Sequence, residues 1–315
     1  TMGRKNAYLG GIIGADPFVP LVSAAGGSET NITVDGTDYT LHTFLGDDSF
    51  TVTQAGKIDI LVVGGGAGGN GGISGNQTGG AGAGAVIYHE GYSISPGTYP
   101  VSIGPGGSGG ADNSYGSNGS DTTVSTATGP LYTAKGGGRG GRGRAGYDGG
   151  SGGGGSRNGD YAGGSAVTTN VHPAGATVYG NDGAAGTQST TNIAGGGGGA
   201  GSSPPSANTN YGGDGKQINI DGNNYYWGGG GGADSGDGGL GGGGGAGRGG
   251  NYNSTGGATP GTAINLGGST GTTSGVHDDG ADAGDNTGGG GGAGLNAADY
   301  GGDGGSGIVM IRYRR

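Results

Sequence analysis

The sequence contains no cysteine, which excludes disulfides, thiol catalysis and thiolate metal sites. It has three Phe, two Met and one Trp in 315 residues, too few large apolar side chains to fill an ordinary core of this length. No apolar run approaches the roughly 18 residues of a membrane-spanning helix, and the opening residues Thr1–Lys5 do not resemble a signal peptide. Membrane insertion is therefore not expected.

Catalytic signatures are also lacking. A GxGxxG match carries no information in a chain so rich in glycine, and no match opens a convincing helix. The four histidines, at positions 42, 89, 172 and 277, show no metal-ligand spacing. We expect neither an enzyme nor a bound cofactor.

Basic residues are scarce, with 13 Lys and Arg against 23 Asp and Glu, and the isoelectric point lies near 4.5. An acidic surface repels nucleic-acid phosphates and anionic membranes. The segment Arg139–Arg144 resembles an RGG box, but it occurs once in an acidic chain. Its arginines are better interpreted as bridges to carbonyls or carboxylates, and no nucleic-acid partner is expected.

Glycine dominates what is present, with 97 residues, about four times the average usage of roughly 7%. Its distribution divides the chain. Residues 1–30 are predicted to be an extended N-terminal arm, and residues 31–135 a β-sandwich with a glycine-rich insertion at 64–84. Residues 136–306 hold 65 of the glycines, and strand 307–315 returns to complete the sandwich.

Alternating and apolar runs predict the strands of the sandwich. Lys57–Val63 is the strongest, because it alternates and then becomes fully apolar. The segments Tyr92–Ile94 and Thr98–Ile103 flank the turn Ser95–Gly97 and predict a hairpin. The other expected strands are 39–44, 49–52, 85–89, 122–125, 131–134 and 307–313.

The glycine-rich section repeats itself, which a flexible linker has no reason to do. The run Gly195–Gly201 recurs as Gly241–Gly247 and as Gly288–Gly294. Two of these runs lead, through spacers of different length, to Tyr-Gly-Gly-Asp-Gly at Tyr211–Gly215 and Tyr300–Gly304. The unit is a run, a variable loop and a return run.

Glycine runs disfavour α-helix, since each glycine costs about 1 kcal/mol relative to alanine. A polyproline-II-like helix has three residues per turn and no internal hydrogen bonds, so its backbone groups must pair with neighbouring chains. Glycine allows that close approach because it lacks a Cβ atom. The predicted fold class is all-β and irregular: a small, jelly-roll-like β-sandwich with an inserted bundle of polyglycine-II helices and almost no α-helix.

The strand Ile58–Val63 running into Gly64–Gly69, the segment Ser95–Gly104 and the closing Gly304–Tyr313 resemble glycine-rich domains of phage tail proteins. The long glycine section is similar in style to tail-fibre tip adhesins of T-even-like phages, whose family fold is a sandwich of polyglycine-II helices with receptor-binding tip loops. It is also similar to the glycine-rich extracellular domain of some receptor tyrosine kinases. In this chain the glycine section lies between β-strands, unlike in the adhesins.

The resemblance implies a virion tail-fibre or adhesin module, located in a tail fibre or outside the cell. Its partner would be a cell-surface glycan or outer-membrane protein, and its arm would join other virion subunits. A homo-oligomer such as a trimer stays open. The alternative function is a purely structural subunit of a fibre, a virion decoration or an extracellular matrix filament, without receptor binding.

Strand connections predict the direction of each run. The strand Lys57–Val63 leads into a glycine run that must start at the sandwich and run away from it, so Ile73–Thr78 should lie at the far end of the bundle. Gly301–Gly307 leads into the last strand and must run toward the sandwich, so the preceding loop Leu295–Asp299 should also lie at the far end. Carried over the repeat, this logic makes Ser202–Asn210 distal and places Lys216–Trp227 and Thr270–Asn286 proximally. The expected receptor-binding residues in the distal loops are Asn76, Pro204, Pro205, Asn208, Tyr211, Asn296 and Tyr300.

Two further clusters have open interpretations. Asp278, Asp279, Asp282 and Asp285 could hold Ca²⁺, but the calcium-binding nonapeptide pattern fails at both candidate segments. A solvated loop is preferred, and no metal site is predicted. The aromatic segment Tyr225–Trp227 suits either recognition or capping of the bundle end.

Overall fold

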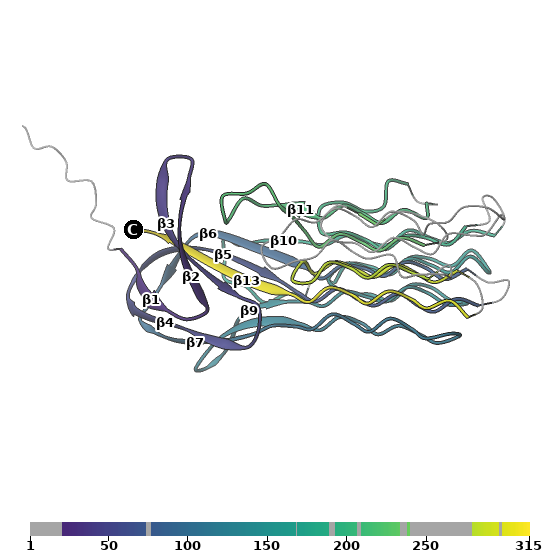
Figure 1. Ribbon diagram of the computed structural model, residues 1–315, viewed down its shortest axis with the longest axis horizontal. Coiled ribbons are helices and arrows are strands. Elements are labelled where there is room, and N and C mark those ends of the chain that lie inside the picture. The colour runs from purple at the N-terminus through teal and green to yellow at the C-terminus, as the bar shows by residue number, and fades with distance from the viewer. Residues whose placement is uncertain are drawn as a thin grey trace, which may run out of the picture.

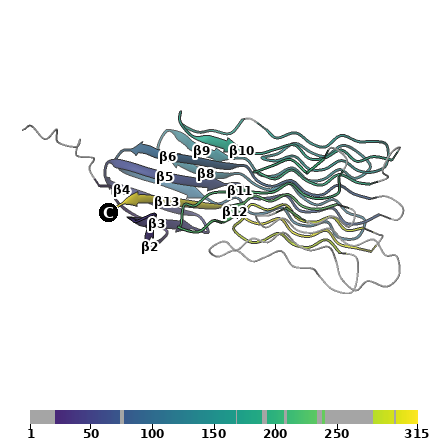
Figure 2. The same ribbon diagram turned by 90° about the horizontal axis from the view of Figure 1, so that it is seen from above.

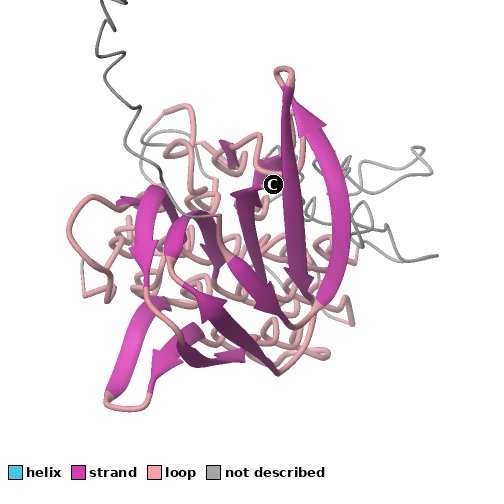
Figure 3. Ribbon diagram, turned by 90° about the vertical axis from the view of Figure 1, so that its left-hand side faces the viewer, coloured by secondary structure: helices cyan, strands magenta, loops and turns pink. Residues whose placement is uncertain are grey.

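The computed structural model describes residues 21–73, 77–167, 169–188, 193–206, 209–233, 238–239, 279–295 and 298–315. Within these residues the secondary structure is entirely β, as expected, with thirteen strands and no α-helix (Figure 3). No described segment is a helix able to cross a membrane. The strands gather at one end of an elongated molecule, and glycine-rich segments run side by side to the other end (Figure 1).

Two antiparallel sheets form the sandwich. The larger has the order β10-β6-β5-β13-β3-β2 and the smaller the order β1-β4-β7-β8-β9. The larger sheet consists of β10 (Thr177–Tyr179), β6 (Val86–Ile94), β5 (Gly56–Val63), β13 (Ile308–Arg314), β3 (Thr37–Phe44) and β2 (Ser28–Val34). The smaller consists of β1 (Ser23–Ala25), β4 (Asp48–Gln54), β7 (Gly97–Ser102), β8 (Thr122–Thr126) and β9 (Gly129–Ala134).

The C-terminal strand lies at the centre of the larger sheet. β13 pairs with β5 on one side and with β3 on the other, although some 245 residues separate it from β5 in sequence. The return of this strand to the sandwich was predicted. The pairing places Ile308, which follows the last glycine run, opposite Val63, which precedes the first.

The centre of the larger sheet is buried on both faces, which explains the apolar runs Ile60–Val63 of β5 and Ile308–Ile311 of β13. One face packs on the smaller sheet, through Ile60, Val62, Val309 and neighbouring side chains. The opposite face, with Leu61 and Met310, packs on a short hairpin of β11 (Lys216–Gln217) and β12 (Tyr226–Trp227). Two Phe and one Trp lie in these cores, and the glycine-rich part that is described is held together by backbone hydrogen bonds instead.

Two local expectations need correction. Ser95–Gly97 does not close a hairpin: β6 pairs with β5 and β10, whereas β7 pairs with β4 and β8, so the turn crosses between the sheets. The expected arm also extends too far. β1 pairs with β4, and β2 begins at Ser28, so residues 23–30 belong to the sheets. Residues 1–20 lie outside the described part of the chain.

Backbone hydrogen bonds in the glycine-rich part repeat every third residue. In the run 64–73, the N–H groups of Gly65, Gly68 and Gly71 donate in turn to the carbonyls of Ser120, Ser117 and Ser114. The next positions, Gly66, Gly69 and Gly72, donate to Gly305, Gly302 and Asp299. Each run therefore bonds several neighbours at once, as polar backbone groups that are buried require.

The backbones approach so closely that no side chain fits between them. A Cβ atom placed on Gly66 would lie 1.9 Å from the carbonyl oxygen of Gly289, and one on Gly154 would lie 1.8 Å from that of Gly195. Most run glycines have φ outside the left-handed region. Glycine is required at these positions for lack of space.

The bundle contains a further segment besides residues 64–84 and 136–306, which the sequence predicted to be glycine-rich. Residues 103–121, between β7 and β8, run out and back, with Gly107 and Gly110 bonded alongside Gly66 and Gly69. The sequence analysis assigned this segment to the sandwich. Viewed from above, the runs form a broad layered array that continues from the sheets (Figure 2).

Candidate functional site at the loop tips

The end of the bundle remote from the sandwich carries the turns between runs. The Gly294 N–H donates to Asn70, and the Gly72 N–H donates to Asp299, so the predicted loops at Ile73 and Leu295–Asp299 lie together. They are at the opposite end from Tyr313, which lies on β13 close to the C-terminus (Figure 1). The polarity predicted for these two loops agrees with the structure.

The polarity predicted for the other repeat is wrong. Gly80 donates to Gly195 and Ala83 to Gly198, so the run Gly195–Gly201 is parallel to the inward run that leads into β6. Ser202 consequently lies near the sandwich, where its carbonyl accepts the Gly199 N–H, so the segment predicted as a distal loop begins at the opposite end. Residues 207 and 208 of that segment lie outside the described part of the chain. Sequence similarity between the repeats did not fix direction, because a glycine run pairs with parallel and antiparallel neighbours alike.

Backbone hydrogen bonds show where the segment Tyr211–Gly215 begins along the length of the bundle. Asn210 accepts a hydrogen bond from Ala233, and Thr209 accepts one from Gly196, which brings the start of Tyr211–Gly215 to the outer part of the bundle. That segment then runs inward to the β11–β12 hairpin, which is proximal as predicted. Of the predicted proximal stretch Thr270–Asn286, residues 270–278 lie outside the described part of the chain. In the part that is described, Asp279 accepts the Tyr300 N–H at the outer end, and the turn up to Asn286 lies near the sandwich.

The predicted recognition residues have different environments. Tyr211 and Tyr300 are exposed, at 48% and 52% of their surface, and Pro205 is also exposed, whereas Pro204 is buried. Asn76, Asn208 and Asn296 lie outside the described residues. The recognition role of all seven stays a prediction.

Side chains hold the described tips to one another. Asp112, in the turn of the 103–121 segment, accepts a hydrogen bond from the Ala298 N–H at 2.9 Å. The Gln77 carbonyl accepts hydrogen bonds from the Ser156 hydroxyl and the Arg157 N–H. The tips thus form a connected surface.

The aspartates considered for calcium serve the backbone of a neighbouring run. Asp279 accepts the Tyr300 N–H and Asp282 accepts the Asp303 N–H, each at 2.7 Å. Among the described residues no three His, Asp or Glu side chains are grouped closely enough to hold a metal ion. Asp278 lies outside those residues.

A cluster of three arginines and two tyrosines lies beside the tips, where the turn around Gly143 meets the 103–121 segment. The Arg139 guanidinium lies over the rings of Tyr115 and Tyr147, at 4.6 and 4.3 Å from their centroids. Arg142 and Arg144 also lie over Tyr115, at 5.2 and 5.7 Å. We call these five residues the arginine–tyrosine cluster.

Hydrogen bonds fix part of the cluster. Arg139 donates to the Gly116 carbonyl, Arg142 to the Asn113 side chain, and Arg144 to the Tyr147 hydroxyl. Bonds from Arg139 and Arg144 lower the pKa of Tyr147 from its usual value. The bridging role expected for these arginines thus holds for carbonyl and amide oxygens. Tyr115 was missed because it is distant in sequence.

The aromatic segment Tyr225–Trp227 is structural. Trp227 is fully buried against Leu41, Leu61 and Met310, and its indole N–H donates to the Ile218 carbonyl. Of the two interpretations considered, packing at the base of the bundle is the one observed.

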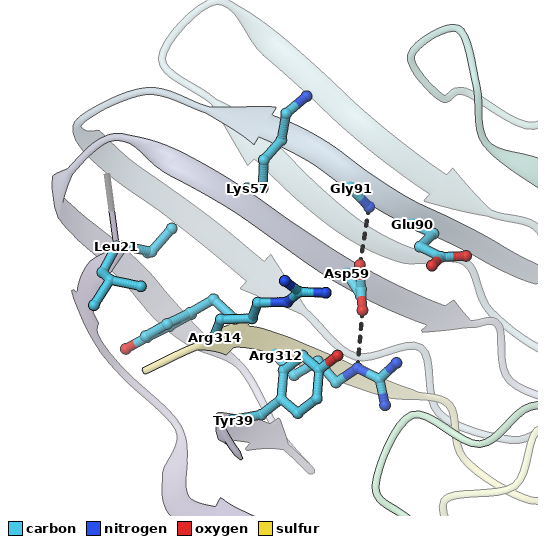
Figure 4. A pocket seen from close by; sticks show the side chains of 10 residues that line it. Leu21, Tyr39, Lys57, Asp59, Glu90, Gly91, Arg312 and Arg314 are labelled. Atoms are coloured by element: carbon cyan, nitrogen blue, oxygen red, sulfur yellow. Dashed lines mark hydrogen bonds and ion pairs between the residues drawn. The ribbon is translucent and has the colours of Figure 1, made fainter. Parts of the chain in front are cut away.

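A pocket of about 440 Å³ lies at the sandwich end (Figure 4). Asp59 is its centre: one carboxylate oxygen accepts the Gly91 N–H, and the other pairs with Arg312 at 2.9 Å. Arg312 also donates to the carbonyls of Asn219 and Ile220 and so ties the hairpin to the sheet. The central charges of the pocket are already paired, which favours a structural role for them.

The chain matches a known protein family. A family model described as a glycine-rich domain matches residues 43–314, which include most of the sandwich and the whole bundle. No curated protein matches the chain.

Proposed function

The chain belongs to the glycine-rich domain family, and from that premise we propose that it is a non-enzymatic attachment module of a virion tail fibre or similar adhesin. The bundle holds recognition loops away from the sandwich, and the loops bind a host cell-surface receptor, a glycan or an outer-membrane protein. The sandwich end, with the N-terminal arm, joins other subunits of the fibre.

We further propose that the runs are polyglycine-II helices. Hydrogen bonds that return to the same neighbour every third residue match a helix with three residues per turn. The absence of room for Cβ atoms at the contacts matches the close approach that glycine permits in such helices. A bundle of this kind is stiff, because the described runs are each tied laterally to several others.

The observation that carries the attachment proposal is the separation of the tips from the sandwich by the length of the bundle. Leu21 and Arg314 line the same pocket at the sandwich end, so the tips lie at the end remote from both (Figure 1). Three of the large exposed side chains, Tyr115, Tyr211 and Tyr300, belong to the bundle. Tyrosine suits recognition because it offers a flat apolar face and a polar hydroxyl.

The test uses the purified full chain with a fluorescent label and a panel of bacterial and eukaryotic cells, read by flow cytometry. Tyr300→Ala removes an exposed tip side chain, and Leu45→Ala removes a side chain of similar exposure, 49%, at the sandwich end. We expect saturable binding to at least one cell type that Tyr300→Ala weakens and Leu45→Ala does not.

Absence of binding to every cell type would favour the structural alternative, a fibre or matrix subunit without a receptor. The lateral bonding of the bundle would suit that role equally well. Equal loss in both variants would also contradict the assignment of recognition to the tips.

A further inference from the structure

We infer that the arginine–tyrosine cluster (Tyr115, Arg139, Arg142, Arg144 and Tyr147) is a binding site for the anionic groups of an acidic cell-surface glycan. This inference rests on the proposed attachment function and names the chemistry of its receptor. The cluster joins two segments that are separate in sequence, and it lies at the tip end, where a receptor would be met.

Charge is the first argument. The chain carries a formal charge of −10, yet three of its 13 basic residues meet at this one place. In the described part of the chain, ion pairs to carboxylates involve Lys135, Arg312 and Arg315, and none involves the three cluster arginines. Three neighbouring guanidinium groups repel one another, and a bound anion would relieve that repulsion.

Unused hydrogen-bond donors are the second argument. Each guanidinium has five N–H donors, and oxygens of the chain occupy only some of them. Arg142 bonds Asn113, whereas Arg139 bonds Gly116 and Tyr147, and Arg144 bonds Tyr147 and Tyr115. The Arg142 Nε atom is buried and has no hydrogen-bond partner in the described structure. Guanidinium groups favour planar oxyanions, which they bind with two parallel hydrogen bonds.

The tyrosines supply the third argument. Tyr115 is 40% exposed although three cations surround its ring. The rings hold the guanidinium planes in place, and an exposed ring also offers a flat apolar face to a sugar. A site that combines oxyanion donors with an aromatic face fits a saccharide bearing carboxylate or phosphate.

A nucleic acid would also offer oxyanions to the cluster, but its charges are more closely spaced than those of such a glycan. A polyanion with a charge on every nucleotide would extend from the cluster over an acidic surface, where each further phosphate is repelled. A glycan with spaced charges, or with one charged branch, avoids that repulsion.

The experiment measures binding of the full chain to immobilised glycans by biolayer interferometry. The probes are sialyllactose, which bears one carboxylate, for carboxylate, phosphorylated lipopolysaccharide for phosphate, dextran as the neutral control, and single-stranded RNA. We expect binding to at least one acidic glycan, none to dextran or RNA, and weakening as salt rises. The two acidic probes distinguish the source of the anion.

The variants are Arg142→Gln and Arg144→Gln, with Arg314→Gln as the matched control. Arg314 is exposed at the sandwich end, so its substitution changes net charge equally. Loss of one charge-assisted hydrogen bond should raise Kd about 10- to 100-fold in each cluster variant, and the control should stay within about twofold. Far-UV circular dichroism checks that each variant folds.

Three outcomes would overturn the inference: no binding to either acidic glycan, equal weakening by Arg314→Gln, or preferential binding to RNA. These results separate the inference from the proposed function. Cell binding that depends on Tyr300 but is unaffected by the arginine variants would leave the attachment function standing and remove the cluster from it.

Discussion

Replacing Gly154 by alanine should destabilise the bundle by several kcal/mol, although alanine is ordinarily the better residue for stability. A Cβ atom there would lie 1.8 Å from the Gly195 carbonyl oxygen and 2.4 Å from its carbon. Contacts below about 3.0 Å are not tolerated, so the two backbones must separate by more than 1 Å.

Separating the two backbones would break hydrogen bonds on both sides of the contact, and the free energy lost can be estimated. The Gly195 N–H donates to Gly155 at 2.9 Å, and the Gly154 N–H donates to Gly80 at 2.9 Å. A shift of 1 Å breaks bonds of that length, and each buried group left without a partner costs about 1–3 kcal/mol. With overpacking of about 1–3 kcal/mol, the expected loss is roughly 3–9 kcal/mol.

Gly46→Ala is the matched control, because no atom lies within 4 Å of the added Cβ and φ at Gly46 is not left-handed. It should change stability by less than about 1 kcal/mol. Urea denaturation followed by the fluorescence of the single buried Trp227, and by circular dichroism, measures both variants. Equal stability of the two variants would refute the close packing of the runs.

Three further predictions concern the sandwich and the metal question. Asp59→Asn leaves the nearly buried Arg312 without its partner charge and should cost about 3 kcal/mol in urea denaturation; an unchanged midpoint would contradict the tie between sheet and hairpin. Burial, followed by the nearby charges of His172 and Lys57, lowers the pKa of His89 below its usual 6.5. The unfolded chain then binds the proton more readily, so stability should be full above about pH 6.5 and fall as pH drops below it. His89→Gln, which can keep the bond to Tyr132, should reduce this pH dependence, and an identical pH profile would be evidence against it. Finally, Ca²⁺ or chelator should leave the thermal midpoint unchanged, because Asp282 already accepts a backbone N–H; a chelator-reversible rise would show a calcium site.

Local pattern predicted the longer apolar strands and missed those that are polar or very short. β5 and β13 were evident because both faces are buried and their residues are apolar. β2 and the β11–β12 hairpin are polar or very short, and their pairing depends on the sheet that they cover. The turn at Ser95–Gly97 has residues typical of a hairpin turn, yet the strands on either side of it, β6 and β7, lie in different sheets of the sandwich.

The candidate site was predictable only where a run was anchored to a strand. The direction of Gly288–Gly294 follows from the return into β13, and it is as expected. The direction of Gly195–Gly201 has no such anchor in the sequence, and it is reversed. The sequence indicated the arginines of the arginine–tyrosine cluster, in the segment Arg139–Arg144. It did not indicate Tyr115, which comes from another run and contacts Arg139 only in the folded chain.

Amide hydrogen exchange resolved to single residues tests the central claim most directly, that the glycine runs form an ordered, laterally bonded bundle carrying the tips. The account predicts that the amides of Gly66, Gly154 and Gly198 are protected to a degree comparable with those of β5, because each donates to a neighbouring run. Exposed amides at the Asp112 turn should exchange rapidly. Exchange of the run glycines at the rate of an unfolded chain, while β5 stays protected, would contradict the account.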